Sequence, residues 1–124
     1  MTQSVGVDIE NVFRFTKELE NKPFLNKIFT KQELDYCFSK SLPEQPLAAR
    51  FAAKEAVSKA LGSLGFTHKN FSLKDIEIKK KENGAPSISI KNLDPKYKIN
   101  ISISHTAEQA IAFCIINLES VPDT

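Results

Sequence analysis

The stretch from Arg50 to Gly62 constrains the fold of this chain more than any other part of the sequence. It is rich in alanine, and apolar residues recur in it at steps of three and four, which is typical of a helix with one buried face. That face carries Ala53, Val57, Ala60, Leu61 and Leu64. Gly62 and Gly65 are expected to end the helix. The rest of the chain should therefore be arranged around this helix.

A neighbouring face of the predicted helix carries Phe51, Glu55 and Lys59 at intervals of four residues. These three side chains should lie one turn apart, with a carboxylate beside an ammonium group. An exposed pair of this kind contributes only about 0.2–0.5 kcal/mol to stability. Taken alone, Glu55 and Lys59 are therefore more simply interpreted as an ordinary helical ion pair.

Length and composition predict one globular domain spanning residues 1–124, with 41% hydrophobic and 26% charged residues. No apolar run approaches the ~20 residues of a membrane span, and the first residues lack a signal sequence, so we expect a cytoplasmic protein with no membrane partner. Cys37 and Cys114 should be buried thiols rather than zinc ligands, because no C-x-x-C spacing is present. The net charge of +2 is too small to indicate nucleic acid as a partner.

Residues Ser4 to Glu10 alternate as in a half-buried strand, with Val5, Val7 and Ile9 on one face. Gly6, Asp8 and Glu10 fall on the other face. Because two carboxylates on one face repel each other, a cation, a basic partner or open water should lie against them. Metal binding and simple exposure are both open at this point.

Helices are predicted on both sides of a proline-rich loop. The first runs from Asn11 to about Asn21, the second begins at Pro23, and the third runs from Thr30 to about Ser39. Thr30 and Glu33 have the spacing of a capping box for the third helix. The segment 41–46 contains two prolines and is expected to be a loop before the central helix.

After Gly65 the pattern changes from helical to alternating. Strands are predicted at 75–79, 87–91, around 99–103 and at 110–116, the last being continuously apolar and so expected to be buried on both faces. An Asn-Gly turn within 82–86 connects the first two, and residues 119–124 should have no regular structure. These elements predict an α+β fold, with helices packed on a small antiparallel sheet that includes the N-terminal strand.

Polar residues interrupt this pattern at four places: Asp8 with Glu10, Glu55 with Lys59, the turn Asn83-Gly84-Ala85-Pro86, and Ser104-His105-Thr106. Carboxylates can hold Mg²⁺, which prefers a few oxygen ligands together with substrate phosphates and water. Lysine, histidine and hydroxyl groups can bind phosphate oxygens. Together these residues indicate metal-assisted phosphoryl or pyrophosphate transfer. Individually each is weak, because a lone histidine or an Asn-Gly turn is more often structural.

The order and spacing of five segments resemble those of the holo-[acyl-carrier-protein] synthases, the small 4'-phosphopantetheinyl transferases. The segments are Val5-Gly6-Val7-Asp8-Ile9, Phe51-Ala52-Ala53-Lys54-Glu55-Ala56 continuing to Lys59-Ala60-Leu61-Gly62, Asp75-Ile76-Glu77-Ile78, Asn83-Gly84-Ala85-Pro86 and Ile103-Ser104-His105-Thr106. The resemblance extends from Val5 to about Leu118, and the joint match is far more specific than any single segment.

The resemblance implies an enzyme that transfers the phosphopantetheine arm of coenzyme A to a serine of apo acyl carrier protein, for fatty acid biosynthesis. It implies that Asp8 and Glu55 bind Mg²⁺ and that Lys59 and His105 contact coenzyme A phosphates. Further coenzyme A contacts would be Arg50, Asn83, Gly84, Pro86, Ser104 and Thr106. Glu55 is the best candidate to accept the serine proton. Arg14 matches a position that receives the acidic carrier protein.

Glu10 departs from the pattern of the small family members. The Asp-Ile-Glu triplet of residues 8–10 is more like that of the larger, two-lobed transferases, so we expect Glu10 to be a third metal ligand. The resemblance also implies a homotrimer with active sites between subunits. Three alternatives stay open: a transferase serving carrier domains of larger synthases, a non-catalytic nucleotide- or RNA-binding module, and a purely structural subunit.

Overall fold

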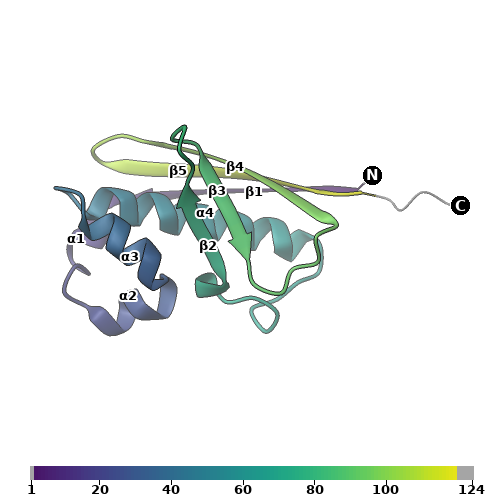
Figure 1. The fold of residues 1–124 in the computed structure, drawn as a ribbon, viewed down its shortest axis with the longest axis horizontal. Coiled ribbons are helices and arrows are strands. Elements are labelled where there is room, and N and C mark those ends of the chain that lie inside the picture. Colours follow the sequence, from purple (N-terminus) through teal and green to yellow (C-terminus); the bar gives the residue numbers. More distant parts are fainter. Residues whose placement is uncertain (1, 120–124) are drawn as a thin grey trace, which may run out of the picture.

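The computed structural model describes residues 2–119 and has the predicted α+β architecture (Figure 1). Its elements are β1 (Thr2–Asn11), α1 (Val12–Thr16), α2 (Lys22–Ile28), α3 (Lys31–Phe38), α4 (Glu44–Ser63), the 3-10 helix η1 (Leu73–Asp75), β2 (Ile76–Lys80), β3 (Pro86–Ile90), β4 (Tyr97–His105) and β5 (Gln109–Leu118). The predicted irregular segment at the C-terminus lies, from residue 120 on, outside the described residues. No helix in the described part of the chain is long and apolar enough to cross a membrane.

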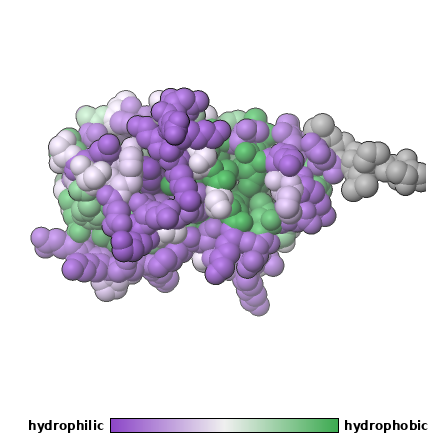
Figure 2. Space-filling view, viewed as in Figure 1, coloured by the Kyte–Doolittle hydropathy of each residue, from purple (hydrophilic) through white to green (hydrophobic). Residues whose placement is uncertain are grey.

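The strands form two antiparallel sheets, so the prediction of a single sheet is wrong. Strands β1, β5 and β4 form one sheet in that order, and β2 and β3 form a separate hairpin. Strand β1 is part of the larger sheet, as predicted. Strands β3 and β4 are not hydrogen-bonded to each other. Ile88, Ile90 and Ile99 line a groove between them. Figure 2 shows a hydrophobic area over this region on an otherwise largely hydrophilic face.

Helix α4 packs along the inner face of the three-stranded sheet and holds the core together (Figure 1). Ala52, Ala53, Ala56, Val57 and Ala60 on this helix are completely buried. Alanine suits this position because its small side chain combines high helix propensity with close approach of the neighbouring backbone. The predicted buried face of the helix is confirmed, although Leu64 at its end is only partly buried.

Strand β1 presents the opposite face to the core from the one that its apolar residues suggest. Val5, Val7 and Ile9 are all more than half exposed, whereas Gly6 is buried against α4. A Cβ atom at Gly6 would lie 1.9 Å from the carbonyl oxygen of Ala56, so only glycine permits this approach. Since side chains alternate along a strand, burying Gly6 also turns Asp8 inward and the valines outward.

Strand β5 is not buried on both faces, contrary to the prediction. Ala112 and Cys114 are buried, but Ile111 and Phe113 between them are 44% and 42% exposed. Ile111 pairs with Ile9, and Phe113 pairs with Val7. Cross-strand partners share a face. The five residues Val5, Val7, Ile9, Ile111 and Phe113 therefore form one exposed apolar surface, which we call the outer face.

Several helices begin or end at other residues than predicted, because of their capping residues and a proline. The helix expected from Asn11 to Asn21 ends at Thr16, and the side chain of Asn11 does not cap it. Asn21 instead caps α2 by accepting a hydrogen bond from the Phe24 N–H. Helix α4 begins at Glu44 and includes Pro46, because the first-turn N–H groups of a helix need no internal partner. The capping box of Thr30 and Glu33 on α3 is confirmed.

Both cysteines are buried in the core, as predicted. Cys37 on α3 and Cys114 on β5 have no exposed surface, and neither forms a disulfide. Burial removes the thiolate from water and raises the pKa of each thiol to about 12.

Candidate active site

The structure brings Asp8, Glu55 and Lys59 together between β1 and α4. The ammonium nitrogen of Lys59 lies 3.3 Å from Oδ1 of Asp8 and 3.0 Å from the carbonyl oxygen of Val7. Asp8 reaches this place because Gly6, two residues earlier on the same face, lets the strand approach the helix. The carboxylate of Asp8 and the ammonium of Lys59 therefore face each other across the contact between sheet and helix.

Glu10 and Arg14 extend this cluster toward α1. The guanidinium of Arg14 donates to Oε1 of Glu10 at 2.9 Å and lies 4.8 Å from the centre of the Phe51 ring. The pKa of Glu10 is raised to about 7, first by burial and then by the neighbouring carboxyl group of Asp8. The ion pair with Arg14 opposes this shift. Glu10 thus bridges the inward-facing carboxylates and an exposed basic side chain.

The charges of this cluster favour a bound cation. Burial and the charge of Asp8 raise the pKa of Glu55, so the carboxyl groups repel one another. Oδ2 of Asp8 is buried and has no hydrogen-bond partner. No group of three or more His, Cys, Asp or Glu side chains within residues 2–119 has the arrangement of a preformed metal site. Two carboxylates with free oxygens fit an ion such as Mg²⁺, which completes its shell with water and substrate phosphate.

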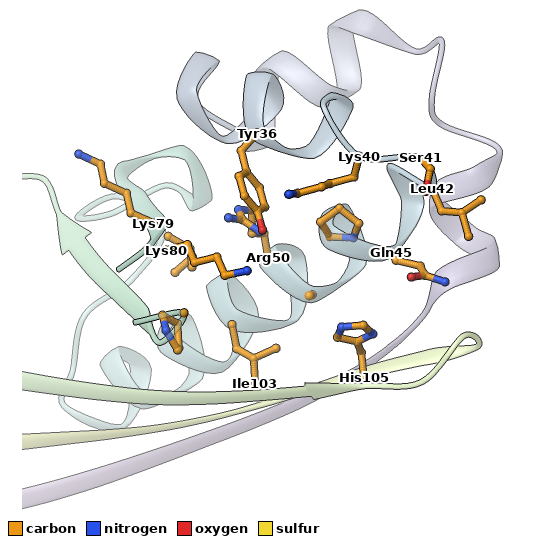
Figure 3. A pocket seen from close by; sticks show the side chains of 15 residues that line it. Tyr36, Lys40, Ser41, Leu42, Gln45, Arg50, Lys79, Lys80, Ile103 and His105 are labelled. Atoms are coloured by element: carbon orange, nitrogen blue, oxygen red, sulfur yellow. The ribbon is translucent and has the colours of Figure 1, made fainter. Parts of the chain in front are cut away.

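A second group of predicted residues lines a cavity of about 350 Å³ between α3, α4, the β2–β3 hairpin and β4. Arg50, Gly84, Pro86 and His105 are among its lining residues. Figure 3 shows Ile103 and His105 reaching from β4 toward the helices that form the opposite wall. Gly84 adopts a φ of 87°, which the turn requires and which favours glycine.

Tyr36, Lys40 and Lys80 are among the lining residues of this cavity that were not predicted. In Figure 3 their side chains gather around the guanidinium of Arg50. That guanidinium lies 4.1 Å from the centre of the Tyr36 ring, and its buried Nε atom has no hydrogen-bond partner. A basic cluster with an unused buried donor can bind a phosphate group, because guanidinium and phosphate pair strongly.

Asn83, Ser104 and Thr106 do not line this cavity. Oδ1 of Asn83 accepts a hydrogen bond from the Ala85 N–H within the turn. The hydroxyl oxygen of Thr106 accepts from the N–H groups of Glu108 and Gln109, which closes the turn between β4 and β5. Ser104 pairs with Ile111 and so shares the outer face of the sheet. In the described chain, these three residues serve turns or point away from the cavity.

Arg50 and Glu55 project from different sides of α4. They are five positions apart, which corresponds to about 140° of rotation and about 7.5 Å of rise in an α-helix. The carboxylate cluster and the basic cavity are therefore two distinct groups on one helix. Together they define a small α+β protein with a site suited to a cation and a phosphorylated ligand.

Comparison with known proteins shows which family of proteins this chain resembles. A profile described as "4'-phosphopantetheinyl transferase superfamily" matches residues 4–114. A holo-[acyl-carrier-protein] synthase of Clostridium novyi is 40% identical over 128 residues, covering 97% of this chain and 91% of that protein. One of Thermodesulfovibrio yellowstonii is 45% identical over 118 residues, covering 94% of this chain and 99% of that protein.

Solved structures agree with the sequence relatives. The Helicobacter pylori holo-[acyl-carrier-protein] synthase in complex with coenzyme A matches with a TM-score of 0.78 and 34% identity, covering 91% of this chain and 99% of that one. A Bacillus anthracis synthase in complex with CoA (3',5'-ADP) matches with a TM-score of 0.78 and 32% identity, covering 91% of this chain and 94% of that one. This chain belongs to the 4'-phosphopantetheinyl transferase superfamily and, within it, to the holo-[acyl-carrier-protein] synthases.

Proposed function

We propose that the protein transfers the 4'-phosphopantetheine arm of coenzyme A to a serine hydroxyl of apo acyl carrier protein. The observation that carries this proposal is the ion pair of Asp8 and Lys59, with Glu55 within range of both charges and one buried oxygen of Asp8 left without a partner. The identities of the relatives and the coenzyme A complexes of two structural neighbours support the same reaction.

In the proposed reaction the serine oxygen attacks the phosphorus that carries pantetheine. The bond from that phosphorus to the bridging pyrophosphate oxygen breaks, and adenosine 3',5'-bisphosphate leaves. Glu55 accepts the serine proton, directly or through water, and burial and the charge of Asp8 raise its pKa, which makes its carboxylate a stronger base. The Lys59 ammonium offsets the negative charge that develops on the pyrophosphate.

Asp8 and Glu55 would hold Mg²⁺ in this site, with Glu10 as a third ligand. When bound, the ion neutralises phosphate charge and orients the pyrophosphate. The charge of the neighbouring Asp8 raises the pKa of Glu10, so the two carboxyl groups lie near each other, which supports the assignment. A Glu10→Gln variant should require more Mg²⁺ for half-maximal activity. An unchanged Mg²⁺ titration would remove Glu10 from the metal site.

The cavity beside Arg50 would hold the nucleotide end of coenzyme A. Arg50, Lys40 and Lys80 supply positive charge there, and His105 reaches in from β4. Asn83, Ser104 and Thr106 remain proposed coenzyme A contacts. They do not reach the cavity within one chain, so they would act from another subunit or through their turns.

Arg14 would receive an acidic surface of the carrier protein. Its side chain is half exposed, and it is held by Glu10 and the Phe51 ring at the edge of the carboxylate cluster. A carrier serine bound beside Arg14 would therefore be close to Glu55 on the neighbouring helix. Electrostatic attraction of this kind raises the association rate and orients the partner.

We further propose a homotrimer whose active sites lie between subunits. Two features support this assembly: the carboxylate cluster and the basic cavity lie on different sides of α4, and the outer face is a contiguous apolar surface on a sheet. Burying such a surface between copies explains why Val7 and Phe113 can be exposed in one chain. Val7→Asp should give monomers in size-exclusion chromatography with light scattering. A Val7→Asp protein that keeps the wild-type mass would contradict the assignment of this interface.

The test of the reaction is intact-protein mass spectrometry of apo acyl carrier protein incubated with coenzyme A, Mg²⁺ and this protein. The carrier should gain the mass of one phosphopantetheine arm, and this gain should disappear with EDTA or with Glu55→Ala. No gain on discrete carriers, but modification of excised carrier domains, would instead assign the protein to larger synthases. A folded protein that modifies neither class would contradict the proposal.

A further inference from the structure

A buried ion pair between Glu33 and Lys54 lies next to the basic cavity and has no place in the reaction described above. The ammonium nitrogen of Lys54 is 2.8 Å from Oε1 of Glu33, and the two side chains are 0% and 1% exposed. Lys54 also donates to the carbonyl oxygens of Leu73, at 2.9 Å, and of Ile76. Oε2 of Glu33 accepts from the Ile78 N–H at 2.9 Å.

These contacts join α3, α4 and β2, which form walls of the cavity, and also reach η1, which does not. Glu33 belongs to α3, Lys54 to α4, and their backbone partners lie in η1 and β2, where the hairpin begins. Lys54 is one turn after Arg50, and Ile78 itself lines the cavity. The pair therefore binds the start of the hairpin at two points, one carbonyl oxygen on Ile76 and one N–H on Ile78.

Stability alone is a poor reason for such a pair. Removing two charges from water costs as much as their attraction returns, and apolar replacements of similar volume are often neutral or stabilising. Burial lowers the pKa of Lys54, and the carboxylate of Glu33 opposes this shift. What an apolar pair could not supply is direction, because only hydrogen bonds select particular backbone groups. The pair thus fixes where β2 lies along α3 and α4.

We propose that Glu33 and Lys54 are positioning residues that set the hairpin wall of the nucleotide cavity. They hold Lys80, Gly84 and Pro86 opposite Arg50, so that the cavity matches a phosphorylated nucleotide before it binds. A second link acts in the same way: the Thr30 hydroxyl donates to Oε2 of Glu77 on β2 at 2.6 Å. This inference rests on the proposed function for the identity of the nucleotide.

The test compares the double variant Glu33→Gln/Lys54→Met with Lys31→Met/Asp35→Asn. The control makes equivalent changes to an exposed ion pair on α3, the helix that carries Glu33. Its N–O distance of 2.9 Å is close to the 2.8 Å of the buried pair. Two readouts are needed: the dissociation constant for adenosine 3',5'-bisphosphate by calorimetry, and KM for coenzyme A against kcat for carrier modification.

The double variant should raise the dissociation constant and KM by about tenfold. A tenfold change is what the loss of about one hydrogen-bonding contact to the nucleotide would give. Its kcat at saturating coenzyme A should stay within about threefold of wild type, because the carboxylate cluster is untouched. The control should change neither constant by more than about twofold. A folded double variant with wild-type affinity for the nucleotide would overturn the proposal.

Thr30→Val and Thr30→Ser decide the matter if the double variant does not fold. Valine removes the hydroxyl that reaches Glu77 and also caps α3 at the Glu33 N–H, and should weaken nucleotide binding by about threefold, whereas serine keeps both bonds and should restore the affinity. Equal affinities for the two variants would overturn the proposal. An inactive wild-type protein that still binds the nucleotide would contradict the reaction and leave the positioning role measurable.

Discussion

Replacing Gly6 with alanine should separate β1 from α4 and disable the carboxylate cluster two residues away. The new Cβ would lie 1.9 Å from the Ala56 carbonyl oxygen and 2.9 Å from the Ala60 nitrogen, and contacts under 3.0 Å are essentially never found. Both obstacles are helix backbone, which cannot rotate away as a side chain can. The strand must therefore move by at least 1.1 Å, the difference between 3.0 and 1.9 Å.

This displacement has a calculable effect on the site. Lys59 on α4 lies 3.3 Å from Asp8 on β1, so moving the strand away from the helix by 1.1 Å displaces the Asp8 carboxylate relative to its partner. Misplacement of a reacting group by about 1 Å can cost about 10²-fold in rate. Overpacking itself costs about 1–3 kcal/mol, which lowers Tm by roughly 4 °C per kcal/mol for a domain of this size.

Carrier modification measured by intact mass, together with thermal unfolding, gives both quantities. Gly62→Ala is the matched control, because a Cβ at Gly62 meets nothing within 4 Å. That variant should keep full activity and gain about 0.5–1 kcal/mol from better helix propensity. A Gly6→Ala protein with the activity and Tm of the control would refute the argument that strand and helix are in forced contact.

Three further outcomes follow from the site. Glu55→Gln should reduce kcat by about 10²-fold or more, as loss of a general base does, without lowering Tm, because it removes repulsion with Asp8; a fall in Tm would show that Glu55 stabilises the fold. Arg50→Met should raise KM for coenzyme A by about 10- to 100-fold, the value of a charge-assisted contact, while KM for the carrier stays constant. Because Glu10 has a pKa raised to about 7, its protonated form is favoured in the folded state, so the metal-free protein should lose stability as pH rises from about 4.5 through 7. Mg²⁺ should therefore raise Tm more at pH 8 than at pH 5, and equal shifts in differential scanning fluorimetry would contradict this charge balance.

The central helix could be predicted from the sequence because one helical periodicity places both its buried residues and its site residues. Apolar spacing identified its buried face, and Glu55 and Lys59 follow from the same period. The N-terminal strand was harder, because alternation reveals two faces without saying which one is inside. Here Gly6, the smallest residue, decides the burial, and hydrophobicity of Val5, Val7 and Ile9 points the wrong way.

The residues missed in the cavity come from elements that the sequence does not connect. In the sequence, Tyr36, Lys40 and Lys80 are ordinary residues of separate segments. Only the packing of α3, α4 and the hairpin brings them to one cavity. Lys54 did carry a signal, since it falls three residues before Val57 and seven before Leu61 on the buried face. A lysine on the buried face of a helix requires a buried partner of opposite charge. Glu33 is that partner, but the sequence indicated only its part in the capping box.

The state of the two cysteines has a consequence for redox chemistry. Coenzyme A and the phosphopantetheine arm both end in a thiol, so an enzyme of this kind works among thiols and, under oxidising conditions, among their disulfides. Exchange with those disulfides requires an accessible thiolate. Cys37 and Cys114 are the chain's two cysteines, and both are fully buried with a pKa of about 12. The folded protein should therefore resist forming mixed disulfides with its own substrate and product.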